Sequence, residues 1–251
     1  MTKHKFKLSK DFDWCPDKPE AMQIYKLLVK DLSPTQFATG KTEVMYKAKR
    51  LEKKFASSPD KLHDYLLLRT IPVVKRGKKF YLVDHHHLVR ALYEALHDKV
   101  DDNELCVYVH VMLDGSSLSK EHFWKAMFER NYVYLFGADG GGPKSPDELP
   151  KHIHDLEFDA YRSLAWLVRD RHGYLKNNTP FSEFKWANFF RTRILPGQGI
   201  LSGKTSFHDF LFEQSKDGKI ELKDEGEDIV DEALFMAIGP EAVGLPGYLG
   251  R

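Results

Sequence analysis

The stretch KKFYLVDHHHLVRALYEAL, residues 78–96, contains the change of pattern that decides the fold of this chain. Its first part is an apolar run typical of a short strand. Further on, apolar residues recur at the spacing of one helical face: Leu88, Ala91, Leu92, Ala95 and Leu96. One acid and three consecutive histidines stand between the two patterns: Asp84, His85, His86 and His87. The sequence therefore predicts a strand, a turn and a helix, with the four polar residues at the junction.

The turn over residues 84–87 has the properties of an anion site. At a helix N-terminus the first backbone N–H groups lack intrahelical partners and the dipole is positive. Histidine side chains there can donate to phosphate, hold a metal ion or transfer a proton near neutral pH, and an acid can orient an imidazole. The structural alternative is that Asp84 caps the helix and the histidines are exposed or simply packed. A metal site of three histidines alone is disfavoured, because adjacent side chains diverge.

The segments before and after the turn predict an α+β N-terminal half. Apolar residues at helical spacing predict a short helix over residues 20–31. Two more helices are predicted over about 41–55 and 59–68. The segment TIPVVKRGKKFYLVD, residues 70–84, is typical of a hairpin. Further predicted elements are a strand over 105–113 and a helix over 120–131.

A break in the pattern separates this half from the rest of the chain. The glycines and prolines of ADGGGPKSPDELP, residues 138–150, cannot sustain a helix or a central strand. Four helical patterns follow, over residues 156–173, 182–194, 206–216 and 229–239. We therefore predict an α+β domain over 1–137, a Gly/Pro-rich loop over 138–150, and a mainly helical extension over 151–251 packed on that domain.

Composition narrows the classes of function. The formal net charge of this 251-residue chain is +1, which gives no strong overall attraction to nucleic acid or to an acidic membrane. The sequence lacks an apolar run of about 18 residues, so no membrane-spanning helix is expected. Cys15 and Cys106 lie far apart and outside any CxxC pair, which disfavours a disulfide framework or a cysteine zinc site. A reducing cytoplasm fits this cysteine usage best.

The junction resembles the Asp-Gly-His-His-Arg turn of the ParB/sulfiredoxin superfamily, in the branch that contains free serine kinases. Here the motif reads Asp84-His85-His86-His87-Leu88, so that a histidine replaces the glycine and a leucine replaces the arginine. Together with PTQFATGKTEV (34–44) and GLPGY (244–248), the motif makes the chain look most like the ParB-like nuclease group. The resemblance implies a small ParB/sulfiredoxin-like sheet with helices. Serine kinase activity is disfavoured, because Gln36 stands where the kinases have a glutamate.

The resemblance and the turn chemistry together predict a protein that binds a phosphate-bearing ligand, a nucleotide above all, and hydrolyses or transfers its phosphoryl group. The predicted catalytic residues are Asp84, His86, His87 and Glu43. The predicted phosphate- or nucleotide-binding residues are His85, His86, His87, Thr35, Gln36, Gly40 and Lys41. Asp84 and Glu43 are also the predicted ligands of a Mg²⁺ ion, which the phosphate chemistry implies.

Two other functions stay open at this point. One is a ParB-like nuclease or phosphodiesterase acting on DNA or RNA, and the other is a non-catalytic DNA-binding or partitioning-type module. Both need a local basic face to hold a polynucleotide. Lysine and arginine cluster over residues 47–54 and 75–79, which could line such a face. We expect no membrane partner, and the sequence leaves the oligomeric state open.

Overall fold

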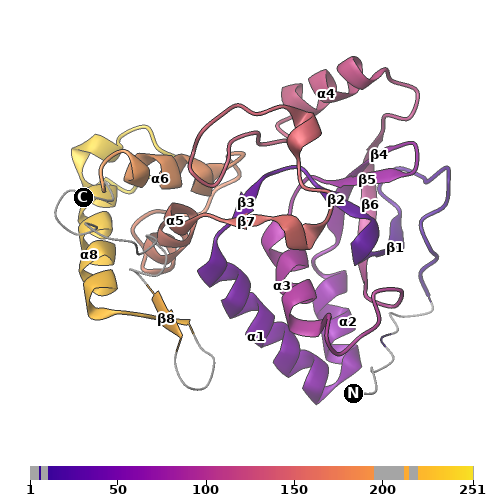
Figure 1. Ribbon diagram of the computed structural model, residues 1–251, viewed down its shortest axis with the longest axis horizontal. Helices are drawn as coiled ribbons and strands as arrows, with labels where there is room; N and C mark the ends of the chain where they lie inside the picture. Colours follow the sequence, from indigo (N-terminus) through magenta and orange to yellow (C-terminus); the bar gives the residue numbers. More distant parts are fainter. Residues whose placement is uncertain (1–5, 7–10, 195–211, 215–219, 251) are drawn as a thin grey trace. The chain divides into compact units, whose positions relative to one another are not determined.

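The computed structural model describes residue 6 and residues 11–194, 212–214 and 220–250. They form an α+β fold, as predicted, and divide into two compact units (Figure 1). The first unit consists of Met1–Ala38, Val44–Gly137 and Gly141–Glu157. The second consists of Thr39–Glu43, Ala138–Gly140 and Phe158–Arg251. Most of the predicted loop 138–150 thus groups with the first unit, and a short segment near residue 40 groups with the second.

A five-stranded mixed sheet organises the first unit, in the order β1-β6-β4-β5-β2. β4 and β5 form the predicted hairpin, and β4 runs parallel to β6 at the centre of the sheet. β2 pairs in parallel with β5, which brings the end of β2 beside the end of β5. The strands are β1 (Ile24–Leu28), β2 (Leu32–Pro34), β4 (Ile71–Arg76), β5 (Lys79–Leu82) and β6 (Cys106–Asp114).

The predicted helix over residues 20–31 is wrong. The segment forms β1 and a 3-10 turn, η1 (Val29–Asp31). β1 pairs antiparallel with β6 along its whole length, and Tyr25 and Leu27 are buried on one side of it. The same apolar residues fit both periods over so short a run, and pairing with a central strand decides between them.

Four helices complete the first unit and confirm the predictions for their segments. They are α1 (Lys41–Ser57, of which the part from Val44 belongs to this unit), α2 (Pro59–Leu67), α3 (His86–Leu96) and α4 (Lys120–Glu129). In Figure 1, α1, α2 and α3 lie on one side of the sheet and α4 on the other. α4 packs Phe123 and Met127 against Val74 of β4. All five apolar residues predicted for the face of α3 are buried.

A buried arginine fixes α3 to a loop far away in the sequence. Arg90 Nη1 donates to the carbonyl oxygens of Ile153, His154 and Leu156 at 3.1, 2.6 and 3.1 Å. Its Nε donates to Glu94 at 2.7 Å. These bonds satisfy carbonyl groups of a loop that has little regular structure besides the 3-10 turns η2 (Pro146–Glu148) and η3 (Ile153–Asp155). The start of α3 is therefore carried by a well-anchored helix.

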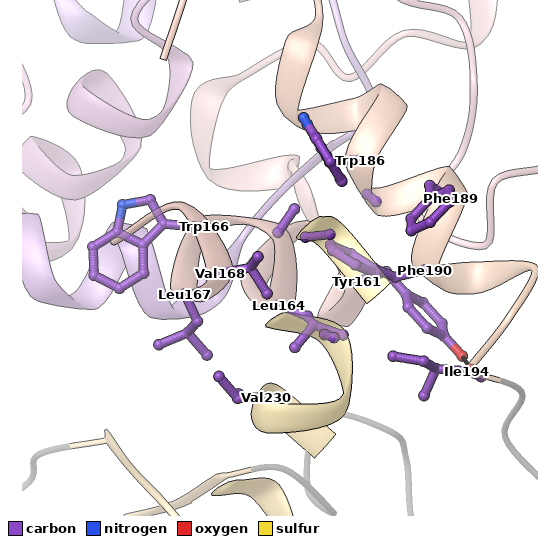
Figure 2. Packing of buried hydrophobic residues seen from close by; sticks show 14 of the residues in the cluster. Tyr161, Leu164, Trp166, Leu167, Val168, Trp186, Phe189, Phe190, Ile194 and Val230 are labelled. Atoms are coloured by element: carbon purple, nitrogen blue, oxygen red, sulfur yellow. Dashed lines mark hydrogen bonds between the residues drawn. The ribbon is translucent and has the colours of Figure 1, made fainter. Parts of the chain in front are cut away.

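In its described residues, the second unit has three helices around an apolar core. α5 (Ala160–Asp170), α6 (Ser182–Arg191) and α8 (Asp224–Ile238) contribute all the residues labelled in Figure 2 except Ile194, which follows α6. The stacked rings of Trp186 and Tyr174, 4.3 Å apart, lie in this core. A 3-10 turn, η4 (Pro240–Ala242), follows α8, and the short strands β3 (Ala38–Thr39) and β7 (Glu157–Phe158) pair where the chain changes unit.

The helix predicted over residues 206–216 is wrong where the structure describes that segment. Residues Phe212–Gln214 form strand β8, which pairs antiparallel with β9 (Ile220–Leu222). The remaining residues of that prediction lie outside the described ranges. The other helical predictions of this half are confirmed by α5, α6 and α8.

Two further expectations concern membranes and thiols. Within the described part of the chain, none of the helices combines the length and the apolar character needed to cross a bilayer. Cys15 and Cys106 are not joined by a disulfide, and Cys106 is buried in β6. Burial raises the pKa of Cys15 to about 11, with the opposing charge of Lys75 a smaller influence.

Two glycines of the C-terminal GLPGY segment, Gly244 and Gly247, differ in their surroundings. This difference predicts how much an alanine at each position lowers the free energy of unfolding. Gly247 has φ +74°, and a Cβ atom there would lie 1.9 Å from the Leu175 carbonyl oxygen. Gly244 has φ +89° with nothing within 4 Å of the same position. Gly244→Ala should therefore cost only left-handed backbone strain, about 1–2 kcal/mol. Gly247→Ala should cost clearly more, because the loop must also move away from Leu175. Chemical denaturation of both variants, followed by fluorescence, measures the difference; equal losses would contradict it.

Candidate functional site

The candidate site lies at the N-terminus of α3, where a hydrogen bond joins two of the predicted motifs. The backbone N–H of Thr35 donates to Nε2 of His86 at 3.1 Å. The Thr35 hydroxyl donates to the Leu82 carbonyl at 2.6 Å. Thr35 follows β2 and Leu82 ends β5, so these bonds continue the parallel pairing of the two strands into the turn. Thr35 therefore lies beside the first residue of α3 in the DHHH turn.

His86 is held as a neutral acceptor. Its side chain is buried, and burial lowers its pKa from 6.5 to about 3 in spite of the nearby charge of Asp84. A ring that accepts at Nε2 carries its proton on Nδ1. We predicted that His86 contacts phosphate and takes part in catalysis. Its nitrogen is instead used to position Thr35, and we assign it a structural role.

Asp84 and His85 face solvent more than the residues after them. The Asp84 side chain is exposed, and its Oδ1 accepts from the His85 backbone N–H at 2.6 Å. His85 is half-buried and precedes α3 with φ +66° and ψ +21°, the left-handed region. A glycine adopts this conformation without strain, which explains why the motif of the resembling family has glycine there. The chain thus keeps a strained residue in the turn.

The remaining predicted residues of this unit are buried. His87 lies in the first turn of α3 and is buried, as is Leu88 at the position of the family's arginine. Gln36 is also buried, and its Nε2 donates to the Ala38 carbonyl at 2.7 Å. That bond shapes the chain after β2. The residues of the turn that reach solvent are therefore Asp84 and His85.

Gly40, Lys41 and Glu43 belong to the second unit. A Cβ atom on Gly40 would lie 3.1 Å from backbone atoms of Arg162 and Ser163, so this glycine allows close packing against α5. We predicted that it lets a ligand approach the backbone. Lys41 Nζ lies 5.8 Å from the centroid of the Phe158 ring.

Glu43 is buried and forms an ion pair, with Arg162 Nη2 donating to its Oε2 at 3.2 Å. A carboxylate in this position is stabilised by its arginine and is not presented to solvent. Within the described residues, no group of three or more histidine, cysteine, aspartate or glutamate side chains could hold a metal ion. Of the two predicted Mg²⁺ ligands, Glu43 is paired with Arg162 and Asp84 is exposed.

Sequence reasoning missed the ionic cluster to which Glu43 belongs. Asp159 caps α5, accepting at Oδ1 from the N–H groups of Tyr161 and Arg162 at 2.9 and 3.1 Å. Its Oδ2 accepts from Arg191 Nη2 at 2.6 Å. Burial raises the pKa of Asp159, and the Arg191 charge opposes that rise. The role of Asp159 could have been predicted, because an aspartate directly before a helical pattern indicates a helix N-cap. The role of Arg191 was not readable, because its partner lies 32 residues earlier.

The basic segment 75–79 contains fewer available charges than its sequence indicates. Lys75 is buried and lies 3.7 Å from the Asp114 carboxylate. Arg76 lies over the Phe123 ring, 5.4 Å from its centroid. Lys78 and Lys79 are exposed at the β4–β5 turn. Part of the 75–79 segment therefore supports the sheet, and two lysines face solvent.

Comparison with known proteins supports the resemblance. The family model described as "Putative ParB-like nuclease" matches residues 25–192. The chain is also similar to a solved structure, a protein from Agrobacterium tumefaciens, with 34% sequence identity and a TM-score of 0.69. That match covers 91% of this chain and 97% of the other. No curated protein matches the chain.

The His86 contact predicts a pH dependence of stability. The unfolded chain carries this histidine with a pKa near 6.5, and the folded protein with a pKa of about 3. Between these values the unfolded state binds a proton that the folded state does not. Folding stability due to His86 is therefore complete above pH 6.5 and is lost as the pH falls towards 3, by up to about 1.4 kcal/mol per pH unit.

We expect His86→Gln, which cannot titrate, to flatten the fall in stability between pH 6.5 and 4.5, a range set by the two pKa values. The matched control is His122→Gln on α4, where the histidine is exposed. Denaturant unfolding at a series of pH values measures both slopes. A His86→Gln slope equal to that of wild type would show that His86 does not resist protonation.

Proposed function

The chain belongs to the ParB-like nuclease family, and from this premise we propose that it is a phosphodiesterase that binds a phosphate group of a nucleic acid or nucleotide at the start of α3. The observation that supports this site most strongly is the rigid turn Asp84–His87. It follows β5, is held by the Thr35–His86 bond, and carries two polar side chains towards solvent at a helix N-terminus.

The roles that we propose for these residues follow from how far each side chain is exposed to solvent. The N-terminal turn of α3 receives a phosphate oxygen, because helix N-termini favour negative charge. His87 lies in that turn and His85 immediately before it. Asp84 orients the His85 backbone through its short hydrogen bond. His86 and Thr35 keep the turn in place and do not contact the substrate.

The proposed reaction is hydrolysis of a phosphate ester. The oxygen of a water molecule attacks phosphorus, and the ester P–O bond breaks. His85 accepts the proton of the attacking water, since an imidazole can act as a general base near neutral pH. The leaving alkoxide takes a proton from solvent. Asp84, the exposed carboxylate of the turn, would be the residue to hold a Mg²⁺ ion, which would offset negative charge on the substrate phosphate.

The proposed substrate is a nucleic acid, with a free nucleotide as the alternative. The family description favours the first, and Lys78 and Lys79 supply exposed positive charge at the β4–β5 turn. We also propose a cytoplasmic location, which the two cysteines support, because they are not joined by a disulfide.

His85→Gly tests the proposal because it separates folding from chemistry. Glycine removes the left-handed strain of a residue with φ +66°, so stability should rise by about 1 kcal/mol. Loss of the general base should lower the hydrolysis rate by a factor of about 10²–10⁴. His85→Asn is the control, because asparagine tolerates the same backbone conformation but cannot take the proton.

The assay uses single-stranded DNA, duplex DNA, RNA and a chromogenic phosphodiester, each with and without Mg²⁺. Wild-type protein should hydrolyse at least one of them, and both His85 variants should be slow on it. A His85→Gly variant that is more stable and fully active would remove His85 from the mechanism. Failure of the wild-type protein to hydrolyse or bind any substrate would reject the proposed function.

A further inference from the structure

The second unit contains an unusual concentration of unsatisfied polar atoms. Seven buried side-chain nitrogen or oxygen atoms of the described residues have no hydrogen-bond partner. Five of the seven belong to four residues of this unit: Thr39, Thr42, Arg162 and Ser182. Buried polar groups in proteins nearly always have partners, and each exception needs an explanation. Five exceptions in one unit point to a group that these atoms are arranged to bind.

Printed contacts connect the four residues into one cluster. Arg162 Nη2 donates to Glu43, and the Thr42 backbone N–H donates to Ser163 Oγ at 3.4 Å. The Asp159 N–H donates to the Thr39 carbonyl at 2.9 Å, and the Asp159 side chain caps Arg162. Ser182 precedes Glu183, whose Oε2 lies 3.9 Å from Arg162 Nη2. The four residues are thus linked through contacts with α5 and the start of α6, although they come from three segments of the chain.

Arg162 is the centre of the cluster. It is 4% exposed, and its contacts with carboxylates involve Nη2 alone. Nε and Nη1, which carry three N–H donors, are buried without a partner. A guanidinium keeps its charge at any physiological pH, so these donors cannot be removed by deprotonation. The N–H groups at Nε and Nη1 therefore require hydrogen-bond acceptors.

The charges around the cluster are balanced. Three arginines face three carboxylates in ion pairs: Arg162–Glu43, Arg169–Glu183 and Arg191–Asp159. The contact of Arg169 with Glu183 leaves that carboxylate shared between two arginines. Additional positive potential comes from the start of α6, a helix of 10 residues that begins at Ser182 and whose N-cap, Phe181, provides no side-chain cap. Binding at this place would depend on directed hydrogen bonds more than on net charge.

We propose that the second unit binds a phosphate-type oxyanion between Arg162 and the first turn of α6. A tetrahedral oxyanion has several acceptor oxygens, which can serve donors that point in different directions. A water molecule offers two lone pairs and cannot satisfy three N–H groups. The hydroxyls of Thr39, Thr42 and Ser182 can donate to the remaining oxygens. The group can be free phosphate or the phosphate of a nucleotide.

This site is independent of the proposed hydrolysis at the start of α3. The two sites are formed by residues of different units, and none of the residues assigned to the reaction belongs to the Arg162 cluster. The experiment therefore monitors Arg162 directly. In a nitrogen–proton NMR spectrum of arginine side chains, the Nε–H signal of Arg162 can be assigned by its loss in Arg162→Lys.

Inorganic phosphate, AMP and acetate are titrated separately into the full-length protein. Phosphate should shift the Arg162 Nε–H signal and raise the melting temperature, and a larger effect of AMP would identify a nucleotide as the source. Arg162→Lys, which keeps the charge next to Glu43, and Ser182→Ala should each weaken binding about tenfold or more. Arg171→Lys is the matched control, since Arg171 ends the same helix and pairs with Glu227 near the surface at 2.7 Å.

The outcomes are distinct. The His85→Gly protein should keep the full phosphate response of Arg162, because its change lies in the other unit. An unmoved Arg162 signal at high millimolar phosphate would overturn the proposal, as would an equal response in Ser182→Ala. A response to acetate without one to phosphate would overturn the phosphate assignment. Loss of hydrolysis in the His85 variants has no bearing on this result, so either proposal can fail alone.

Discussion

The hydrogen bond from the Thr35 N–H to His86 Nε2 is the interaction on which the arrangement of the first unit's site depends. It ties the end of β2 to the first residue of α3, across 51 positions of sequence. Because the ring accepts this bond in a buried place, it stays neutral, and burial lowers its pKa to about 3. A histidine used in this way cannot also be the cation that attracts phosphate. The adjacent histidines of the motif therefore have different roles, set by which side of the helix start each occupies.

Buried or half-buried arginines hold irregular backbone in place in both units. Arg90 satisfies three carbonyl groups of a loop and fixes that loop to α3. Arg191 joins Asp159 at the cap of α5 to the Ala138 carbonyl, 3.1 Å away. A planar group with five donors can hold irregular backbone that has no strand or helix partner. Arg162 differs from these two, because a large part of its donor capacity is unused within the described structure.

His85 combines backbone strain with the role that we propose for it. A residue with φ +66° is expected to be glycine on conformational grounds, and the resembling family has glycine there. The histidine destabilises the turn and places an imidazole near solvent at a helix N-terminus. Locally unfavourable backbone conformations often persist at functional sites because the surrounding structure holds them. Asp84, whose carboxylate accepts from the His85 N–H, and the anchored α3 provide that support here.

The sequence by itself determined the α+β class, the hairpin, α3 with its buried face, and most of the C-terminal helices, because long amphipathic patterns and turn residues act locally. It also determined the family, through the DHHH and PTQ motifs. It could not decide residues 20–31, since a short apolar run fits a helix or a strand until β6 pairs with it. Nor could it separate His86 from His85, or show that Glu43 meets Arg162. Those assignments depend on partners 51 and 119 positions away, and only the tertiary structure brings such partners together.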